Sequence, residues 1–199
     1  MPARDKLRNA LVPAALALAA AIAAPHHAAA QTVLAGPFLI TVGGTRYYII
    51  DANDFAAARA WAQATIGGDA ATITSAADNS FFPVFHAARM PFVIGLNDSA
   101  VEGTFVWADG STSAYRNWAP NEPAQSNTAA SDQVIVNTNG TWVPAPDSAV
   151  RRVLVMSNAP LRVPQEFPTL AAAITFATNS GLRDIELAPG TYSVAAPLT

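Results

Sequence analysis

Apolar and polar positions alternate along several short segments of this chain, a pattern typical of β-strands with one buried face. In the segment 104–107, Phe105 and Trp107 fall on the same side. The other segments expected to be strands span 37–51 (two strands around a glycine turn), 69–74, 93–96, 133–137, 141–143 and 150–156. Turn dipeptides, Asp109-Gly110 and Asn139-Gly140, support hairpin connections. The pattern predicts a sheet of short antiparallel strands in which Pro144 ends one strand.

Two helices are predicted between the first strands. Asp54 is a suitable N-cap for a helix that runs to about Ile66, where Gly67-Gly68 ends it. Its apolar stripe consists of Phe55, Ala58, Trp61 (or Ala62) and Ile66. A second helix is expected after Ser75, over residues 76–90. Helices and strands together predict an α+β fold, with two helices flanking antiparallel strands.

The first thirty residues have the pattern of a secretory signal peptide. Arg4, Lys6 and Arg8 precede an apolar run over 10–24, and the alanines at 28–30 offer a small-residue cleavage site. A membrane anchor is the alternative, but the apolar run is shorter than the ~20 residues that a span needs. We therefore expect no integral membrane segment after removal of residues 1–30, and a secreted, periplasmic or cell-surface protein.

Charge and cysteine content narrow the classes of function. Of 11 basic and 14 acidic residues in the chain, three basic and one acidic residue lie in the first thirty. The remainder is acidic and has no basic patch, so nucleic acid is not an expected partner. The chain contains no cysteine, so an exported domain of this size depends on its core and on any bound ion rather than on disulfides.

Several motifs in the middle of the chain occur in a fixed order. They are Val93-Ile94-Gly95-Leu96, Glu102-Gly103-Thr104-Phe105-Val106-Trp107, Asn117-Trp118, Glu122-Pro123-Ala124 and Gly140-Thr141-Trp142. This order resembles the C-type lectin-like domain, particularly its bacterial, disulfide-free members, over about residues 36–160. The resemblance implies that family's fold, with a long loop over about 109–131 that holds the ligand. It also implies a cis peptide at Glu122-Pro123 and core positions for the tryptophans of the motifs.

The resemblance indicates where a sugar ligand would bind. In calcium-binding members, the sugar site uses the Glu and Asn of an E-P-N motif, a later Glu, and an Asn-Asp pair after the final Trp. This chain keeps Glu122, but the remaining positions hold Ala124, Ser131, Val143 and Pro144. Because one carboxylate cannot hold Ca²⁺, this site is expected to be degenerate. The expected ligand contacts are Tyr115, Asn121, Glu122 and Asn127, with Tyr115 the aromatic side chain best placed for exposure.

An auxiliary calcium site of the family lies in the acidic loop after the 93–96 strand. Its carboxylates correspond to Asp98, Glu102 and Asp132. Three carboxylates, with backbone carbonyls and water, would suit Ca²⁺, which takes about six to eight oxygen ligands. The alternative is that Asp98 caps the loop and Glu102 is solvated. Calcium is thus the candidate cofactor of this loop, beside the alternative of a loop held by the protein alone.

Catalysis finds little support. The chain has no thiol, and His86 lies on a Phe-rich helix with no second histidine outside the first thirty residues. A carboxylate pair for glycoside hydrolysis could be drawn from Asp98, Glu102, Glu122 and Asp132, but no pattern marks one of them as a general acid. The chain is therefore expected not to be an enzyme.

The segment from Leu161 onward has a different pattern. A short strand precedes a helix from Pro168, and a strand over 184–187 and a turn over 188–192 follow. The apolar face of this helix consists of Leu170, Ala173, Ile174 and Ala177. The order resembles the cap and first rung of a pectate-lyase-like right-handed parallel β-helix, truncated within 161–199. Because one solenoid repeat cannot bury its apolar face alone, the segment either belongs to a longer protein or packs back on the lectin-like domain.

These features predict an exported binding or adhesion module that recognises a glycan or a protein surface ligand. The alternative is an accessory domain of a polysaccharide-degrading β-helix enzyme whose catalytic part lies outside this chain. A third interpretation is a structural surface domain whose ligand loop has lost its site, as Ala124, Val143 and Pro144 suggest.

Overall fold

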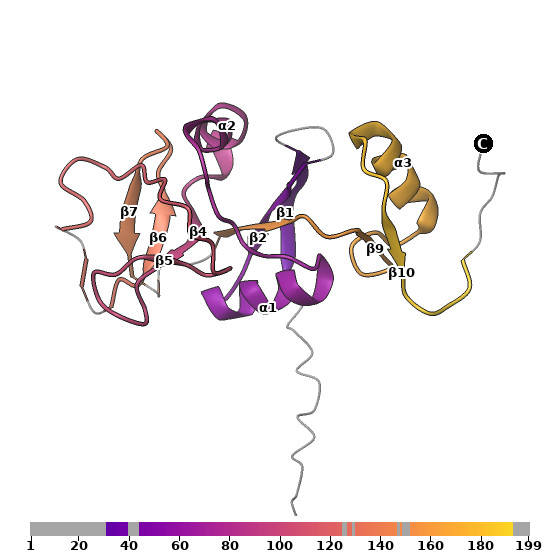
Figure 1. Ribbon diagram of the computed structural model, residues 1–199, viewed down its shortest axis with the longest axis horizontal. Coiled ribbons are helices and arrows are strands. Elements are labelled where there is room, and N and C mark those ends of the chain that lie inside the picture. Colours follow the sequence, from indigo (N-terminus) through magenta and orange to yellow (C-terminus); the bar gives the residue numbers. More distant parts are fainter. Residues whose placement is uncertain are drawn as a thin grey trace, which may run out of the picture.

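The structure is a computed structural model. It describes residues 31–39, 44–124, 127–128, 130–146, 148 and 152–192. The expected signal peptide therefore lies outside the described residues. Figure 1 shows a main body, in which helices α1 (Phe55–Thr65) and α2 (Ala76–His86) lie on opposite sides of a sheet. A smaller unit follows at the C-terminal end, made of β9 (Leu161–Val163), α3 (Leu170–Ser180) and β10 (Ile185–Leu187).

The main sheet has the strand order β1-β2-β8-β4-β6-β7, with β3 paired to β8 and β5 paired to β4. These strands are β1 (Thr32–Leu39), β2 (Arg46–Asp51), β3 (Asp69–Ala70), β4 (Phe92–Asn97), β5 (Val106–Trp107), β6 (Gln133–Val136), β7 (Trp142–Ala145) and β8 (Arg152–Ser157). The pairs are antiparallel except β4 and β8, which are parallel at Val93 and Val153. The sheet is therefore mixed, whereas the sequence predicts antiparallel strands. The long connection between β4 and β8 permits either direction, unlike a hairpin.

Both faces of the central strands are buried. In β2, Tyr47 and Ile49 belong to the cluster that contains Phe82 of α2. Tyr48 and Ile50 belong to the cluster around α1. Because successive side chains of a strand point to opposite faces, one continuous apolar segment supplies both clusters.

Helix α1 forms as predicted, because its end signals are local. The Asp54 Oδ1 atom accepts a hydrogen bond from the Ala57 N–H at 2.6 Å, which caps the helix. The buried residues of the predicted stripe are Ala58, Trp61, Ala62 and Ile66. Helix α2 ends at His86 and a 3₁₀ turn continues to Arg89, so the predicted helix over 76–90 changes type near its end. His86 is expected to be a packed or half-exposed helix residue, but its side chain is not among those that the structure describes.

Several strand boundaries differ from the prediction. Strand β1 begins at Thr32, before the expected start at residue 37, and β5 is limited to Val106–Trp107. Strand β3 ends at Ala70, whereas the sequence predicts a strand to residue 74. Strand β7 continues through Pro144, so the prediction that this proline ends the strand is wrong. Strand β7 is last in the sheet order, and Pro144 lies opposite Val134 of β6. Proline is tolerated at a sheet edge because the donor that it lacks is not needed on the unpaired side.

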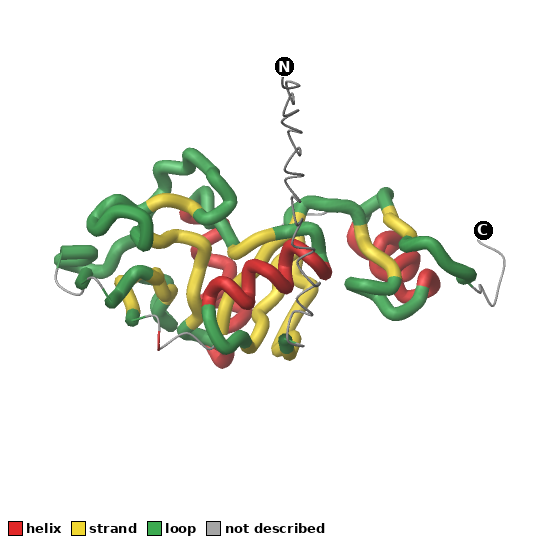
Figure 2. The backbone as a smooth tube through the Cα atoms, turned by 90° about the horizontal axis from the view of Figure 1, so that it is seen from below, coloured by secondary structure: helices red, strands yellow, loops and turns green. Residues whose placement is uncertain are grey.

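The C-terminal unit has the predicted order of strand, helix and strand. Strands β9 and β10 pair in parallel, and α3 connects them. Ala173 and Ala177 of α3 are buried, whereas Ile174 is half-buried. Figure 2 shows this unit beside the main body, at one end of the molecule.

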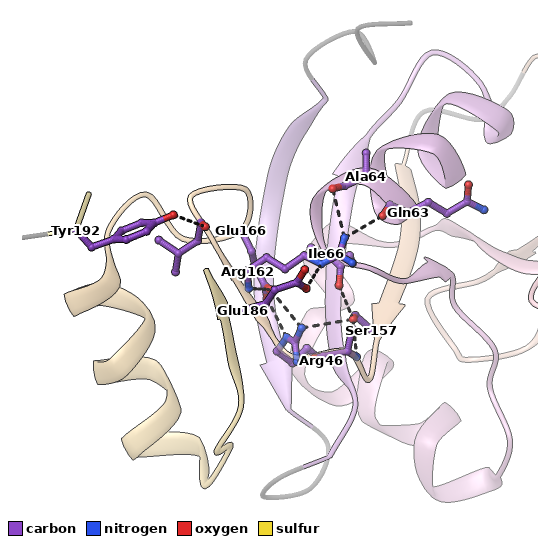
Figure 3. Close-up of polar contacts among 11 residues, drawn as sticks. Arg46, Gln63, Ala64, Ile66, Ser157, Arg162, Glu166, Glu186 and Tyr192 are labelled. Atoms are coloured by element: carbon purple, nitrogen blue, oxygen red, sulfur yellow. Dashed lines mark hydrogen bonds and ion pairs between the residues drawn. The ribbon is translucent and has the colours of Figure 1, made fainter. Parts of the chain in front are cut away.

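Polar contacts join the two parts at β2 (Figure 3). The Arg46 guanidinium donates to both carboxylate oxygens of Glu166, at 2.9 and 3.2 Å, and to the Ala159 carbonyl at 2.8 Å. The Tyr48 hydroxyl also donates to Glu166. Arg162 donates to the Gln63 carbonyl at the end of α1, at 3.2 Å. The segment therefore does pack against the lectin-like part of the chain.

Candidate functional site

Neighbouring strands bring two acidic residues together. Asp98 directly follows β4 and Asp132 directly precedes β6, and these strands pair through Asn97 and Gln133. The Asp98 N–H donates to the Asp132 carbonyl at 3.2 Å. Glu102 lies in the loop after Asp98, and ligand oxygens of the three carboxylates lie within 4.8 Å of one another. The three residues of the predicted auxiliary calcium site therefore lie close together.

The two carboxylate oxygens of Asp98 have different surroundings. Oδ2 accepts hydrogen bonds from the Gly103 N–H at 2.8 Å and from the Asn127 amide at 3.0 Å. Oδ1 is buried and has no hydrogen-bond partner among the residues that the structure describes. A buried polar atom without a partner costs about 1–3 kcal/mol. Capping of the loop by Asp98 therefore explains the hydrogen bonds of Oδ2 but does not explain why Oδ1 is buried.

The charges of this acidic group repel one another. Desolvation, and then the negative charges of Asp98 and Asp132, raise the pKa of the exposed Glu102 carboxyl. A bound cation would relieve this repulsion and give Asp98 Oδ1 a partner. Carboxylate and amide oxygens are ligands that Ca²⁺ prefers, and Asn127 Oδ1 is a second buried oxygen without a hydrogen bond in the described structure. The donor set of this loop therefore fits a calcium ion.

The residues expected at the sugar-binding calcium position offer a different donor set. Val143 and Pro144 lie in β7 and have no side-chain oxygen. Ser131 is buried, and its hydroxyl lies 3.1 Å from that of Thr128. Glu122 supplies the one carboxylate among these positions, and Ala124 follows it in the same turn.

The tryptophans are core residues, as predicted. Trp107 and Trp142 are 3% and 0% exposed, and Trp118 is half-buried against them. The ring of Tyr115 lies edge-on to Trp142, with 5.6 Å between centroids. Tyr115 is half-buried and more exposed than Trp107 and Trp142, although it packs on the core rather than standing free. Its neighbour Arg116 holds the loop by donating to the Ser113 and Tyr115 carbonyls, at 2.9 and 2.7 Å.

The other expected ligand residues separate into two places. Asn121 is exposed and has a φ of 67°, and the half-buried Glu122 follows it. Both lie in a turn in which the Glu122 N–H donates to the Ala119 carbonyl at 3.0 Å. The peptide between Glu122 and Pro123 is cis, as predicted. Asn127 instead bonds to Asp98 and so belongs to the acidic loop.

Asn79 of α2 is a buried polar residue that holds the turn before β7, a role that the sequence does not predict. Its buried side chain accepts from the Trp142 indole at 2.7 Å and donates to the Gly140 carbonyl at 3.0 Å. The amide of Asn117 donates to the same carbonyl at 2.8 Å. Polar residues occupy several positions of α2, so no local pattern in the sequence distinguishes Asn79.

Comparison with known proteins agrees with this architecture. The family model for the lectin C-type domain matches residues 52–154, just over half of the chain. Human versican core protein is 46% identical over 55 residues, which make up 27% of this chain and 2% of versican. The human low affinity immunoglobulin epsilon Fc receptor is 40% identical over 57 residues, which make up 29% of this chain and 17% of the receptor. The chain thus spans a small part of the length of these relatives.

Among solved structures, the chain is similar in fold to a calcium-independent type II antifreeze protein. The TM-score is 0.52 with 22% sequence identity, and the alignment covers 66% of this chain and 98% of that protein. Among the described residues, no helix combines the length and apolar character needed to cross a membrane. The matched family model, the motif order and the observed strand topology agree, and this chain belongs to the C-type lectin domain family.

Proposed function

We propose that this chain is an exported binding or adhesion module that recognises a glycan or another surface ligand through its C-type lectin domain. Family membership supports a binding role, because the matched domain is a recognition module and not a catalytic one. We assign ligand contact to Asn121 and Glu122, which share the turn after Ala119. Tyr115 and Asn127 would position the loop, since one packs on Trp142 and the other bonds to Asp98.

We further propose that Ca²⁺ stabilises the loop region through Asp98, Glu102 and Asp132. The observation that carries this proposal is the buried Oδ1 atom of Asp98, which has no hydrogen-bond partner in the described structure and lies in a group of three carboxylates. The calcium ion would supply positive charge to a group of three carboxylates and a partner to Asp98 Oδ1. It would thereby fix the segments that lead into and out of the ligand loop.

The sugar-binding calcium position is proposed to be degenerate. Ala124, Val143 and Pro144 supply no side-chain oxygen, and Ser131 is bonded to Thr128. Ligand contact would then use protein side chains directly. Removal of calcium would weaken binding indirectly, by loosening the loop.

A glycan and cell-surface panel tests the binding role. The protein would be screened in millimolar Ca²⁺ and again in EDTA. We expect binding to at least one class of ligand, weakened by Asn121→Gly or Glu122→Gln. Glycine keeps the positive φ of Asn121 and removes its side chain. Glu186→Gln is the matched control, since Glu186 is exposed on the C-terminal unit. Absence of binding in both conditions would contradict the proposal.

A second candidate is an accessory domain of a β-helix enzyme that degrades polysaccharides. The parallel pairing of β9 and β10 across α3 supports it, because stacked parallel strands build such solenoids. The gene sequence downstream of the codon for Thr199 tests it. Continuing solenoid repeats with clustered acidic and basic residues would support the enzyme context, and an immediate stop codon would contradict it.

A further inference from the structure

A polar cavity of about 310 Å³ lies on a different part of the lectin domain from the acidic loop. Its walls come from the start of β2, the segment after β3, the first turn of α2, the turn after β5 and the end of β8. None of Asp98, Glu102 and Asp132 is among the described residues that line it. Its volume lies at the lower end of the range of small-molecule sites, about 300–1,000 Å³.

The cavity carries negative charge that its own lining does not neutralise. Asp78 and Asp109 line it, and none of the described lining residues is Lys, Arg or His. Tyr47 also lines the cavity. Burial raises the pKa of its hydroxyl most, and the negative charge of Asp78 raises it further. Outside the lining, Arg59 pairs with Asp69 and donates to the Ala108 carbonyl, and its charge also interacts with Asp109, which leaves Asp78 as the less compensated carboxylate. The cavity therefore favours a cation over an anion.

Each of the two carboxylates accepts one hydrogen bond from a neighbouring residue. Thr74 donates to Asp78 Oδ2 at 2.8 Å, and the Ser111 N–H donates to Asp109 Oδ1 at 2.9 Å. Thr72 is 2% exposed, and its hydroxyl has no hydrogen-bond partner among the described residues. Thr72 is among the residues that line the cavity, so a ligand group that reached this hydroxyl would supply the hydrogen bond that it lacks.

We propose that this cavity is a second binding site, whose ligand is a small polyhydroxylated molecule with a protonated amine, such as an amino sugar with a free amino group. The carboxylates of Asp78 and Asp109 bind the ammonium group. The hydroxyls of Thr72, Thr74 and Ser111 pair with ligand hydroxyls. One oxygen of each carboxylate already accepts a hydrogen bond, and two carboxylates fall short of the roughly six to eight oxygens that Ca²⁺ takes, which favours an organic ammonium over a bare divalent cation.

Ligand-observed NMR titration of the protein with D-glucosamine tests the site, with D-glucose and N-acetylglucosamine as uncharged analogues. We expect glucosamine to bind more tightly than either analogue, because only its amine is protonated. The double variant Asp78→Asn/Asp109→Asn should lower glucosamine affinity by about tenfold or more, since each charged hydrogen bond is worth about one factor of ten. Equal binding of the three sugars, or no effect of the double variant, would overturn the proposal.

Two further variants separate this site from fold and from calcium. Thr72→Val is nearly isosteric, so it should weaken glucosamine binding and leave the melting temperature unchanged or higher. Glu102→Gln and EDTA should weaken glucosamine binding much less than the double variant does, because the acidic loop does not line the cavity and acts only through the loop that carries Asp109. Glucosamine binding that disappears in EDTA or in Glu102→Gln would assign it to the calcium-dependent surface instead and overturn the second site.

Discussion

Arg46 of β2 and Glu166 of the C-terminal unit form a buried ion pair although 120 residues separate them in the sequence. Each side chain is 1% exposed, and the pair is joined by the Tyr48 hydroxyl and the Arg162 N–H. Burial removes both charges from water, so each depends on the other for its stabilisation. The C-terminal unit is therefore held against the lectin domain by this ion pair and by the hydrogen bonds that Tyr48 and Arg162 donate to Glu166.

Replacing Glu166 should destabilise the whole chain. Glu166→Gln leaves the Arg46 charge buried without its partner, and we expect a loss of about 3–5 kcal/mol in the free energy of unfolding. Urea denaturation measures this change. Glu186→Gln is the control, because the Arg162–Glu186 pair is partly exposed and should be worth at most about 1 kcal/mol. A loss in Glu166→Gln no larger than that in Glu186→Gln would show that the junction does not support the fold.

The ion pair between Arg59 and Asp69 should make stability depend on pH. Burial raises the pKa of Asp69, but hydrogen bonds from Arg59 and from the Ala70 N–H outweigh it and hold the pKa below its ordinary value of 3.8. The pair therefore contributes stability above about pH 4, and this contribution is lost as the pH falls through the lowered pKa.

Urea denaturation of the wild type and of Asp69→Asn over a pH series measures this effect. The wild type should be the more stable protein near neutral pH, and the difference should shrink below about pH 4. Arg59→Gln should show the same loss of pH dependence. A difference that grows at low pH would mean that the Asp69 pKa is raised in the folded protein.

Gly95 should tolerate no side chain. A Cβ atom at this position would lie 2.8 Å from the Ala70 carbonyl oxygen and 3.0 Å from that of Ala71. The Gly95 N–H bonds to the Ala71 carbonyl at 2.8 Å, so the two backbones cannot separate without losing this bond. We expect Gly95→Ala to lower the melting temperature, with an overpacking cost of about 1–3 kcal/mol.

Gly190→Ala is the matched control for Gly95→Ala in a thermal melt. The nearest atom to a Cβ at Gly190 is 3.9 Å away on Tyr192, an ordinary contact. Its effect should stay within about 0.5 kcal/mol. Similar melting temperatures for the two variants would contradict the close backbone contact at Gly95.

Features with local signals were predictable from the sequence. The cap at Asp54 and the stripe of α1 depend on residues within one helix, and period-2 alternation places Trp107 in the core. The acidic group of Asp98, Glu102 and Asp132 followed from the family resemblance, and the pairing of β4 with β6 explains why Asp132 lies beside Asp98.

Features that depend on distant packing were not predictable. The partner of Arg46 has no signal near it in the sequence, because the contact forms only after the C-terminal unit returns to β2. Tyr115 lies in a polar loop, and its ring nevertheless packs edge-on against Trp142, a contact between residues 27 positions apart in the sequence. Pro144 stays in a strand because β7 is at the end of the sheet order, a property of topology and not of the residue.

The most direct test of the calcium-stabilised lectin domain is a thermal melt of the protein in millimolar Ca²⁺ and in EDTA, for the wild type and for Asp98→Asn. An ion at 100 times its dissociation constant adds about 2.7 kcal/mol, a rise of about 5–10 °C for a chain of this size. We predict this rise for the wild type and for the control Asp184→Asn, and its loss in Asp98→Asn. Identical melting of the wild type in Ca²⁺ and in EDTA would contradict the account, because the buried oxygen of Asp98 would then have no ion to bind.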